Sequence, residues 1–294
     1  MIKQTLTFQN PASLLLRDKQ LIIQLKDIDY EITRPIEDIG VIIIENPMVK
    51  TTVPLLNALA DNNVAVIFCD DHAMPKSMLV TLDGNATLQE TYRYQKEVTL
   101  PIKKQIWKQI VEIKIKNQSA LLNKLNKDGD ILKPYYTNVK SGDSDNREGI
   151  AARAYWNILL GDDFRRERNG TPPNNLLNYG YAILRAATAR SLVGSGLYPA
   201  FGIFHHNRYN AFPLADDIME PYRPFIDEVV YRLYYDGACS DLNKNAKMAL
   251  QRVLFCDVKM GKLTRPLEIA LSLTTASLVK MYKKETEKLV LPFL

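Results

Sequence analysis

The feature that most constrains the fold of this chain is a change in hydrophobic periodicity between residues 85 and 90. Before it, short runs rich in Ile, Leu, Val and Thr lie at 12–16, 20–25, 29–33 and 40–45. Runs of this length, bounded by turn residues, are typical of the strands of meanders and sandwiches. After it, apolar residues recur every three or four positions, as they do in amphipathic helices. The order of the two patterns predicts an α+β multidomain protein.

The first pattern predicts a small N-terminal domain that resembles a β-sandwich. A short helical pattern at 53–59 precedes a further apolar strand at 64–69, and the turn-forming residues Asp83, Gly84 and Asn85 follow. Asp, Gly and Asn favour turns because they tolerate backbone conformations that other residues avoid. We therefore expect the β-rich domain to span residues 1–88.

The second pattern predicts a larger all-α domain over residues 89–294. Its first helix carries Ile102, Ile106, Ile110 and Ile113 on one face. A polar, turn-forming stretch occupies 128–146 and ends where a new helix should begin. Loops rich in Asn, Gly and Pro then separate the remaining helical patterns, at about 147–160, 174–193, 214–236, 243–256 and 265–288.

Charge is divided unequally between the two predicted domains. The chain has a net charge of +5, but residues 1–85 have a net charge of −4 and residues 86–294 have +9. Within 91–127, nine residues are basic and two are acidic. A solvated helix face explains such a run, and a stripe that contacts phosphates is the alternative. The surplus makes a polyanionic partner of the second domain a hypothesis to test.

The sequence shows no sign of secretion or membrane insertion. Its first residues lack the basic-then-apolar layout of a signal peptide. The longest apolar runs, 41–44 and 64–69, are far shorter than the ~20 residues that span a bilayer. Three scattered cysteines (Cys69, Cys239 and Cys256) form no C-x-x-C pair and are interpreted as reduced thiols. We expect a cytoplasmic protein with no membrane partner.

Several catalytic chemistries lack their motifs in this chain. It contains no G-x-x-x-x-G-K-[ST] phosphate loop, no G-x-G-x-x-G after a predicted strand and no G-x-S-x-G elbow. The dispersed cysteines also argue against a structural zinc site.

A cluster of imidazole and carboxylate residues predicts a divalent-metal site in the second domain. His205 ends an aromatic, Gly-containing run, and Asp217 and Glu220 follow it. If 214–220 is helical, the i,i+3 spacing places these two carboxylates on one face. Two carboxylates with one imidazole make an oxygen-rich site that suits Mg²⁺ or Mn²⁺ better than a zinc cage.

A third ligand must come from elsewhere in the fold, and Glu148 is the candidate. It precedes Gly149, Ala151 and Ala152, which are small enough to let another backbone approach. The alternative interpretation is structural. With Asp145 as the N-cap, Glu148 would be the third helical residue, where a Glu closes a capping box. Both interpretations remain open on the sequence.

Several motifs occur in collinear order along nearly the whole chain. They are Leu55-Leu56-Asn57-Ala58-Leu59, Lys114-Ile115-x-Asn117-Gln118, Glu148-Gly149-x-Ala151-Ala152-x-x-Tyr155, Gly202-Ile203-Phe204-His205 and Asp217-Ile218-Met219-Glu220-Pro221-Tyr222-Arg223-Pro224. Together they resemble the universal CRISPR-associated adaptation endonuclease and integrase family, which acts in spacer acquisition. The loop 206–210 resembles the branch of that family that accompanies a single-protein RNA-guided effector nuclease (type II).

The resemblance implies a site and a set of partners. In that family a Glu, a His and an acidic residue hold Mg²⁺ or Mn²⁺, and they correspond to Glu148, His205 and Glu220, with Asp217 as an accessory catalytic carboxylate. The resemblance also implies a homodimer formed through the β domains, and two such dimers bridged by a small ferredoxin-like CRISPR adaptation companion. The RNA-guided effector nuclease is a further partner hypothesis.

The implied function is that of a metal-dependent DNA endonuclease and strand-transferring integrase. The 3′-OH of a short captured DNA attacks a phosphodiester of the CRISPR repeat, and water in its place gives hydrolysis. The candidate DNA-binding residues are Lys103, Lys104, Lys108, Arg147, Arg153, Arg208 and Arg223. Two alternatives stay open, a non-catalytic nucleic-acid-binding scaffold and a metal-dependent repair nuclease for branched DNA.

Overall fold

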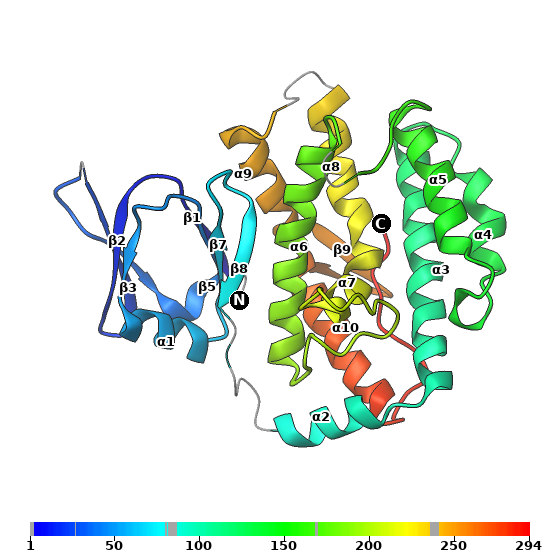
Figure 1. Cartoon of the computed structure of the whole chain (residues 1–294), viewed down its shortest axis with the longest axis horizontal. Coiled ribbons are helices and arrows are strands. Elements are labelled where there is room, and N and C mark those ends of the chain that lie inside the picture. Colours follow the sequence, from blue (N-terminus) through cyan, green and yellow to red (C-terminus); the bar gives the residue numbers. More distant parts are fainter. Residues whose placement is uncertain (1–2, 27, 80, 82–86, 168–169, 236–240) are drawn as a thin grey trace. The chain divides into compact units, whose positions relative to one another are not determined.

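The structure is a computed structural model that describes residues 3–26, 28–79, 81, 87–167, 170–235 and 241–294. The chain divides into two compact units, Met1–Leu88 and Gln89–Leu294. Figure 1 shows the first unit in blue to cyan and the second from cyan through green and yellow to red. The predicted turn at Asp83, Gly84 and Asn85 lies outside the described residues.

The first unit contains two four-stranded sheets, which agrees with the predicted β-rich, sandwich-like domain. One sheet has the order β1 (Gln4–Phe8), β5 (Ile39–Ile44), β7 (Ala65–Cys69), β8 (Pro75–Leu79). The other has the order β4 (Ile32–Pro35), β3 (Gln20–Leu25), β2 (Ala12–Arg17), β6 (Lys50–Thr51). The edge strands β1 and β8 are not among the predicted strands, because each is only five residues long and lacks the continuous apolar run by which the other strands were recognised.

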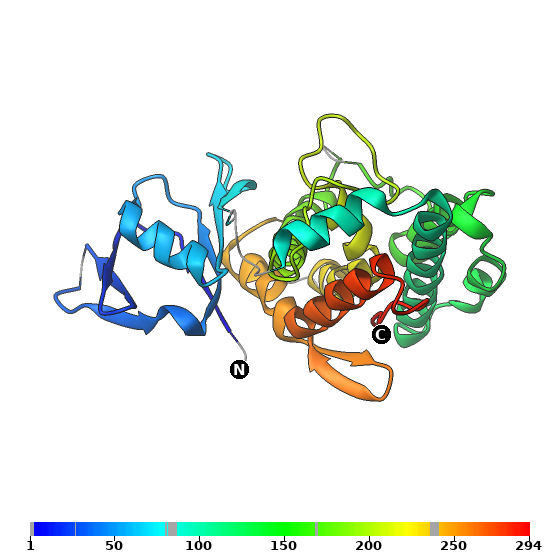
Figure 2. The same cartoon turned by 90° about the horizontal axis from the view of Figure 1, so that it is seen from below.

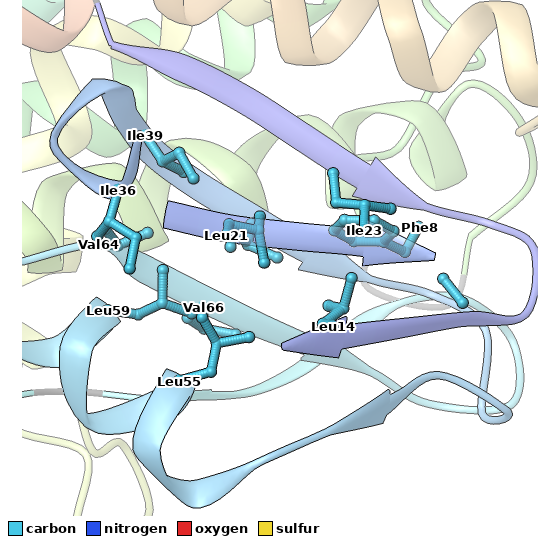
Figure 3. Close-up of a cluster of buried hydrophobic side chains, with 12 residues drawn as sticks. Phe8, Leu14, Leu21, Ile23, Ile36, Ile39, Leu55, Leu59, Val64 and Val66 are labelled. Atoms are coloured by element: carbon cyan, nitrogen blue, oxygen red, sulfur yellow. The ribbon is translucent and has the colours of Figure 1, made fainter. Parts of the chain in front are cut away.

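The core of this unit lies between the two sheets and helix α1 (Val53–Asp61) (Figure 3). Leu14, Leu21 and Ile23 come from one sheet and pack with Ile42 and Val66 of the other. β5 is apolar throughout because it is a central strand, with neighbours on both edges and buried residues on both faces.

The second unit is largely helical, which confirms the predicted fold class. Its helices are α2 (Leu88–Glu97), α3 (Leu100–Lys124), α4 (Lys133–Thr137), α5 (Arg147–Leu160), α6 (Asn174–Gly194), α7 (Pro213–Met219), α8 (Arg223–Tyr235), α9 (Lys244–Arg252) and α10 (Leu267–Tyr282). α6 packs against α7, α8, α9 and α10, and α3 packs against α4, α5 and α8 (Figures 1 and 2). The long helix α3 thereby connects segments that are far apart in the sequence.

The sequence pattern predicts one helix over 214–236, but the structure divides it. A 3₁₀ turn, η4 (Glu220–Tyr222), separates α7 from α8. Pro221 and Pro224 explain the break, because proline has no backbone N–H and disfavours a helical residue before it. The break places Glu220 in a tight turn that contacts α3.

The prediction of an all-α second domain is wrong in one respect. β9 (Asp257–Met260) and β10 (Leu263–Pro266) form an antiparallel hairpin between α9 and α10. Gly261 has a φ of +64° in its turn, a conformation that favours glycine. Each strand has only four residues, so its alternation of apolar and polar side chains is too short to be recognised between the helical patterns before and after it. No helix of the described residues is long and apolar enough to cross a membrane.

Candidate active site

The loop that carries His205 is fastened to the buried carboxylate of Asp217 on α7. The Oδ2 atom of Asp217 accepts hydrogen bonds from the backbone N–H groups of Ile203 (2.6 Å) and Phe204 (3.1 Å). Its Oδ1 atom accepts one from the backbone N–H of His205 (3.1 Å) and lies 2.7 Å from Nδ1 of the same residue. A carboxylate only accepts hydrogen bonds, so Nδ1 carries the proton. In the neutral ring, Nε2 therefore keeps its lone pair for a ligand.

Gly202 allows the loop to come this close. A Cβ atom at this position would lie 2.4 Å from the carbonyl oxygen of His205 and 3.4 Å from Oδ2 of Asp217. The first distance is shorter than any real contact, and the obstacle is backbone, which cannot rotate away. The glycine within the aromatic run is thus required by packing.

Aromatic packing holds the other side of the loop. The ring of Phe204 stacks on Trp107 of α3, with centroids 4.2 Å apart and an interplanar angle of 4°. The imidazole of His205 meets the same indole edge-on, with centroids 5.8 Å apart. Trp107 is buried, whereas half of Phe204 is exposed. The imidazole is therefore positioned by Asp217 and by Trp107 together.

Glu148 lies in the first turn of α5, which has two polar caps. The side chain of Asn146, the N-cap in a left-handed conformation, accepts from the backbone N–H of Gly149. The carboxylate of Asp143 accepts from the backbone N–H groups of Arg147 (2.7 Å) and Glu148 (3.0 Å). The capping-box alternative is wrong, because Asp145 is not the N-cap and Glu148 is the second helical residue. Its side chain is instead directed to another partner.

Glu220 is held in the η4 turn by contacts with α3 and α8. Its Oε1 atom pairs with the guanidinium of Arg223 at 2.9 Å. The side-chain amide of Asn117 on α3 donates to the carbonyl of Pro221 at 2.8 Å, which fixes the turn itself. The side chain of Glu220 is only 5% exposed, so its charge is almost completely removed from water.

Glu148 and Glu220 converge on one ammonium group, that of Lys114. The Lys114 Nζ atom forms an ion pair with Oε1 of Glu148 and lies 2.5 Å from Oε2 of Glu220. Lys114 is buried, so it does not belong to the basic surface stripe that the composition of 91–127 suggests. The sequence contains a signal that could have found it, because Lys114 follows Ile110 by four residues and thus falls on the apolar face of α3.

The charges in this cluster support one another. Burial disfavours the charged forms of both Lys114 and Glu220, but the neighbouring charges outweigh it. The negative charges of Glu220 and Glu148 raise the pKa of Lys114. The positive charges of Arg223 and Lys114 lower the pKa of Glu220. The pKa of His205 is raised, mainly by its hydrogen bond to Asp217 and further by the charge of Glu220. The charge of Glu220 thus influences the ionisation of His205, and the charge of His205 influences that of Glu220.

The donor set fits a hard divalent cation. Two carboxylates and one imidazole nitrogen are the ligand types that Mg²⁺ and Mn²⁺ accept. The buried Oε2 atom of Glu220 accepts no hydrogen bond of good geometry within the described residues and has only its ion pair with Lys114. In the described part of the chain, no three carboxylate, imidazole or thiolate groups stand close enough to hold a metal ion as they are. The ammonium of Lys114 stands between two of the three candidates.

A second buried network adjoins the cluster. The carboxylate of Asp227 on α8 accepts hydrogen bonds from the hydroxyl groups of Tyr155 (2.8 Å) and Tyr181. Burial raises the pKa of Asp227 to about 6. The guanidinium of Arg223 lies 4.7 Å from the centroid of the Tyr181 ring, so the same arginine contacts Glu220 and this network. α5, α6 and α8 are tied together beneath the candidate site.

The candidate DNA-binding residues lie in different settings. Lys104, Arg153 and Arg208 are exposed, and the guanidinium of Arg208 stacks on the ring of Tyr209. Other members of the set are half-buried and paired: Lys108 with Glu112 (3.6 Å), Arg147 with Asp145 (2.9 Å) and Arg223 with Glu220. Lys103 is half-buried as well. The structure therefore gives Arg223 a carboxylate partner inside the site.

Comparisons with known proteins agree on one family. The family described as CRISPR associated protein Cas1 matches residues 6–254. The CRISPR-associated endonuclease Cas1 of Neisseria meningitidis serogroup C (strain 8013) is 37% identical over 265 residues, which are 89% of this chain and 86% of that protein.

Solved structures share the fold of the chain. A casposase bound to an integration product has a TM-score of 0.78, with 20% identity over 98% of this chain and 92% of that chain. A Cas6-RT-Cas1–Cas2 complex has a TM-score of 0.75, with 20% identity over 98% of this chain and 36% of that chain. At these identities the likeness shows the fold.

Proposed function

Because the chain belongs to the CRISPR-associated protein Cas1 family and is an endonuclease of CRISPR adaptation, we propose that it inserts captured DNA by direct strand transfer. The 3′-OH of a short duplex attacks a phosphodiester of the CRISPR repeat, and the 3′ oxygen of the repeat strand leaves. One phosphodiester bond forms as another breaks, so the reaction needs no external energy source. Water in place of the 3′-OH gives the nuclease reaction.

One observation carries the proposal, namely that the Glu148 and Glu220 side chains meet at Lys114. These carboxylates come from α5 and η4, and the imidazole of His205 lies within range of the charge of Glu220. We assign Glu148, His205 and Glu220 as ligands of Mg²⁺ or Mn²⁺ and Asp217 as the residue that orients His205. When bound by these residues, a divalent cation would polarise the scissile phosphate and stabilise the added negative charge of the transition state.

The protein residues supply positioning. Asp217 fixes the ring plane of His205 and keeps the proton on Nδ1, which directs Nε2 away from α7. Trp107 packs edge-on against the imidazole and restricts its rotation. Arg223 forms an ion pair with Oε1 of Glu220, and this pairing keeps the buried carboxylate ionised. These contacts hold the His205 and Glu220 side chains in place before DNA binds, so these two groups need little rearrangement during the reaction.

Basic residues of the second unit hold the DNA backbone in this proposal. The exposed Lys104, Arg153 and Arg208 are the first candidates, and the half-buried Lys103, Lys108 and Arg147 are the next. Phosphate contacts position a duplex but do not read its sequence, so the repeat is selected partly by its deformability. Arg223 contributes through Glu220 in this scheme.

We further propose that the first unit, 1–88, forms the homodimer contact and that the second unit, 89–294, carries catalysis and DNA binding. One fold neighbour is a Cas6-RT-Cas1–Cas2 complex, which supports an adaptation companion for this chain. In the proposal this companion is small and ferredoxin-like, and it bridges two dimers. The proposal also includes membership of the type II branch, with the RNA-guided effector nuclease as a partner. It further includes a cytoplasmic location.

A strand-transfer assay tests this function. A labelled duplex with free 3′-OH ends is mixed with a plasmid that carries a CRISPR repeat, the companion protein and Mn²⁺. We expect joined products with the wild type and with Glu112→Gln, a surface control on α3, and none with Glu148→Gln. Cleavage of branched DNA without any joining would favour the repair nuclease. Salt-sensitive DNA binding without any metal-dependent product would favour the scaffold.

A further inference from the structure

Lys114 is the buried cation around which the candidate metal ligands are arranged. It lies near the middle of α3, and its side chain is 8% exposed. Its ammonium contacts a carboxylate from α5 and one from η4, and these two segments are separated by the whole of α6 and α7 in the sequence. The ammonium donates a hydrogen bond to Glu148, and its positive charge forms an ion pair with Glu220 at the same time.

The backbone segments that carry Glu148 and Glu220 are held in place by contacts that do not involve Lys114. Asn146 and Asp143 cap the first turn of α5, which fixes the start of the Glu148 side chain. Asn117, three residues after Lys114 on the same helix, holds the carbonyl of Pro221 in η4. The two carboxylates are therefore brought toward a fixed point, and Lys114 occupies that point.

The charges at this point are already balanced. Glu148 and Glu220 carry two negative charges, and Lys114 and Arg223 supply two positive charges at ion-pair distance. A divalent cation that bound Glu148 and Glu220 would take the same carboxylate oxygens that face Nζ. It would also stand close to a like charge in a poorly solvated place, where charge–charge interactions are strong.

We propose that Lys114 is a positioning residue that sets the metal affinity of the site. Its ammonium gathers the Glu148 and Glu220 carboxylates and competes with a divalent cation for their oxygens. Metal binding is then an exchange, in which the ammonium yields one or both carboxylates as the cation arrives. The inference rests on the proposed assignment of Glu148 and Glu220 as metal ligands.

Mn²⁺ binding without DNA tests the exchange directly. The free Mn²⁺ signal in electron paramagnetic resonance gives the dissociation constant of each protein, and thermal unfolding in EDTA and in Mn²⁺ gives the stabilisation by metal. The variant is Lys114→Met, which removes the charge and keeps an unbranched side chain. The matched control is Lys116→Met on the same helix, where the exposed lysine lies over the ring of Phe293.

We expect Lys114→Met to bind Mn²⁺ at least about tenfold more tightly than the wild type, because a like charge near the ion has been removed. It should also unfold at a lower temperature in EDTA and gain more from Mn²⁺, since its two carboxylates lack their cation. Lys114→Arg retains the charge and should stay within about threefold of the wild-type affinity. Lys116→Met should match the wild type in both measurements.

Unchanged or weaker Mn²⁺ binding by Lys114→Met, beside saturable binding by the wild type, would overturn the role of Lys114 alone. Should Lys114→Met not fold, Lys114→Gln provides a neutral side chain that still donates to a carboxylate, and the same gain in affinity is required of it. An absence of saturable Mn²⁺ binding by the wild type would overturn the metal-ligand assignment and this inference together. Failure of the strand-transfer assay with intact Mn²⁺ binding would affect the proposed reaction and leave Lys114 in its role.

Discussion

The Nδ1 atom of His205 lies 2.7 Å from Oδ1 of Asp217, a carboxylate with no exposed surface. The same carboxylate accepts three backbone N–H groups of the loop 203–205. One buried side chain therefore determines both the path of the loop and the orientation of the imidazole. Asp217 acts through His205 rather than on a substrate in this arrangement.

Asp217→Asn should destabilise the second unit and misorient His205. An amide has one acceptor oxygen in place of two, so at least one buried N–H loses its partner, at a cost of roughly 1–3 kcal/mol. The pKa of His205 should fall, because its hydrogen bond to a carboxylate is what chiefly raises it. Urea unfolding gives the first effect, and NMR titration of the imidazole gives the second.

The sign of the pH effect follows from this pKa. A histidine whose pKa is raised by folding adds stability at low pH, and the contribution is lost as the pH rises through the folded pKa. Asp217→Asn should therefore lose more stability at pH 5 than at pH 8. Asp216→Asn, at the neighbouring carboxylate that pairs with Arg185, is the control and should shift the imidazole less. An unshifted His205 titration in Asp217→Asn would contradict the assignment.

Gly202→Ala should abolish activity while leaving most of the protein folded. The new methyl group would meet the carbonyl of His205 at 2.4 Å, so the loop must move away from Asp217. Overpacking of this kind costs about 1–3 kcal/mol. The comparison is Gly180→Ala on α6, whose methyl group would meet Ile226 at 2.5 Å, in the packing of α6 against α8. Equal loss of strand transfer in both variants, at a temperature where both are folded, would show that the loop has no special role.

Asp227→Asn should change how stability depends on pH. Burial raises the pKa of Asp227 to about 6, so the folded state holds its proton more tightly than the unfolded state. This contribution to stability is present at low pH and is lost as the pH rises through about 6. Between pH 5 and pH 7, Asp227→Asn should gain roughly 1 kcal/mol relative to the wild type. Urea unfolding at both pH values measures the change, and a constant difference between the proteins would contradict it.

Lys104→Gln and Arg153→Gln should weaken DNA binding without affecting folding. Both side chains are exposed, and each lost phosphate contact reduces the slope of log K against log salt by about 0.9. Fluorescence anisotropy at several salt concentrations gives the slope. Arg17→Gln is the control, because Arg17 pairs with Glu31 in the first unit. Slopes that match the wild type would remove these residues from the DNA surface.

Arg223→Gln should behave differently from the exposed basic variants. Glu220 would remain buried with one of its two cations missing, and such a change costs about 3–5 kcal/mol. The main effect is therefore a lower unfolding midpoint in urea rather than a smaller salt slope. A variant with wild-type stability and a reduced salt slope would return Arg223 to the set of direct phosphate contacts.

The sequence alone determined the two-part fold and most of the candidate site. Strand and helix periodicities are local, because they depend on which face of each segment is apolar, so they indicate the fold class without any tertiary contact. The spacing of Asp217 and Glu220, the position of His205 and the motif around Glu148 were equally readable. Short or interrupted elements, such as the β9–β10 hairpin and the break at η4, were too brief for periodicity to resolve.

Only the tertiary structure determines which partner each buried charged side chain has. Composition placed Lys114 in a basic helix, but packing buried it against carboxylates from α5 and η4. Packing likewise pairs Arg223 with Glu220, Asp217 with the loop that carries His205, and Asp227 with two tyrosines. The partner of a buried charge comes from whichever distant segment packs against it, and a local pattern contains no information about that segment. The requirement that buried charges be compensated then selects the arrangement.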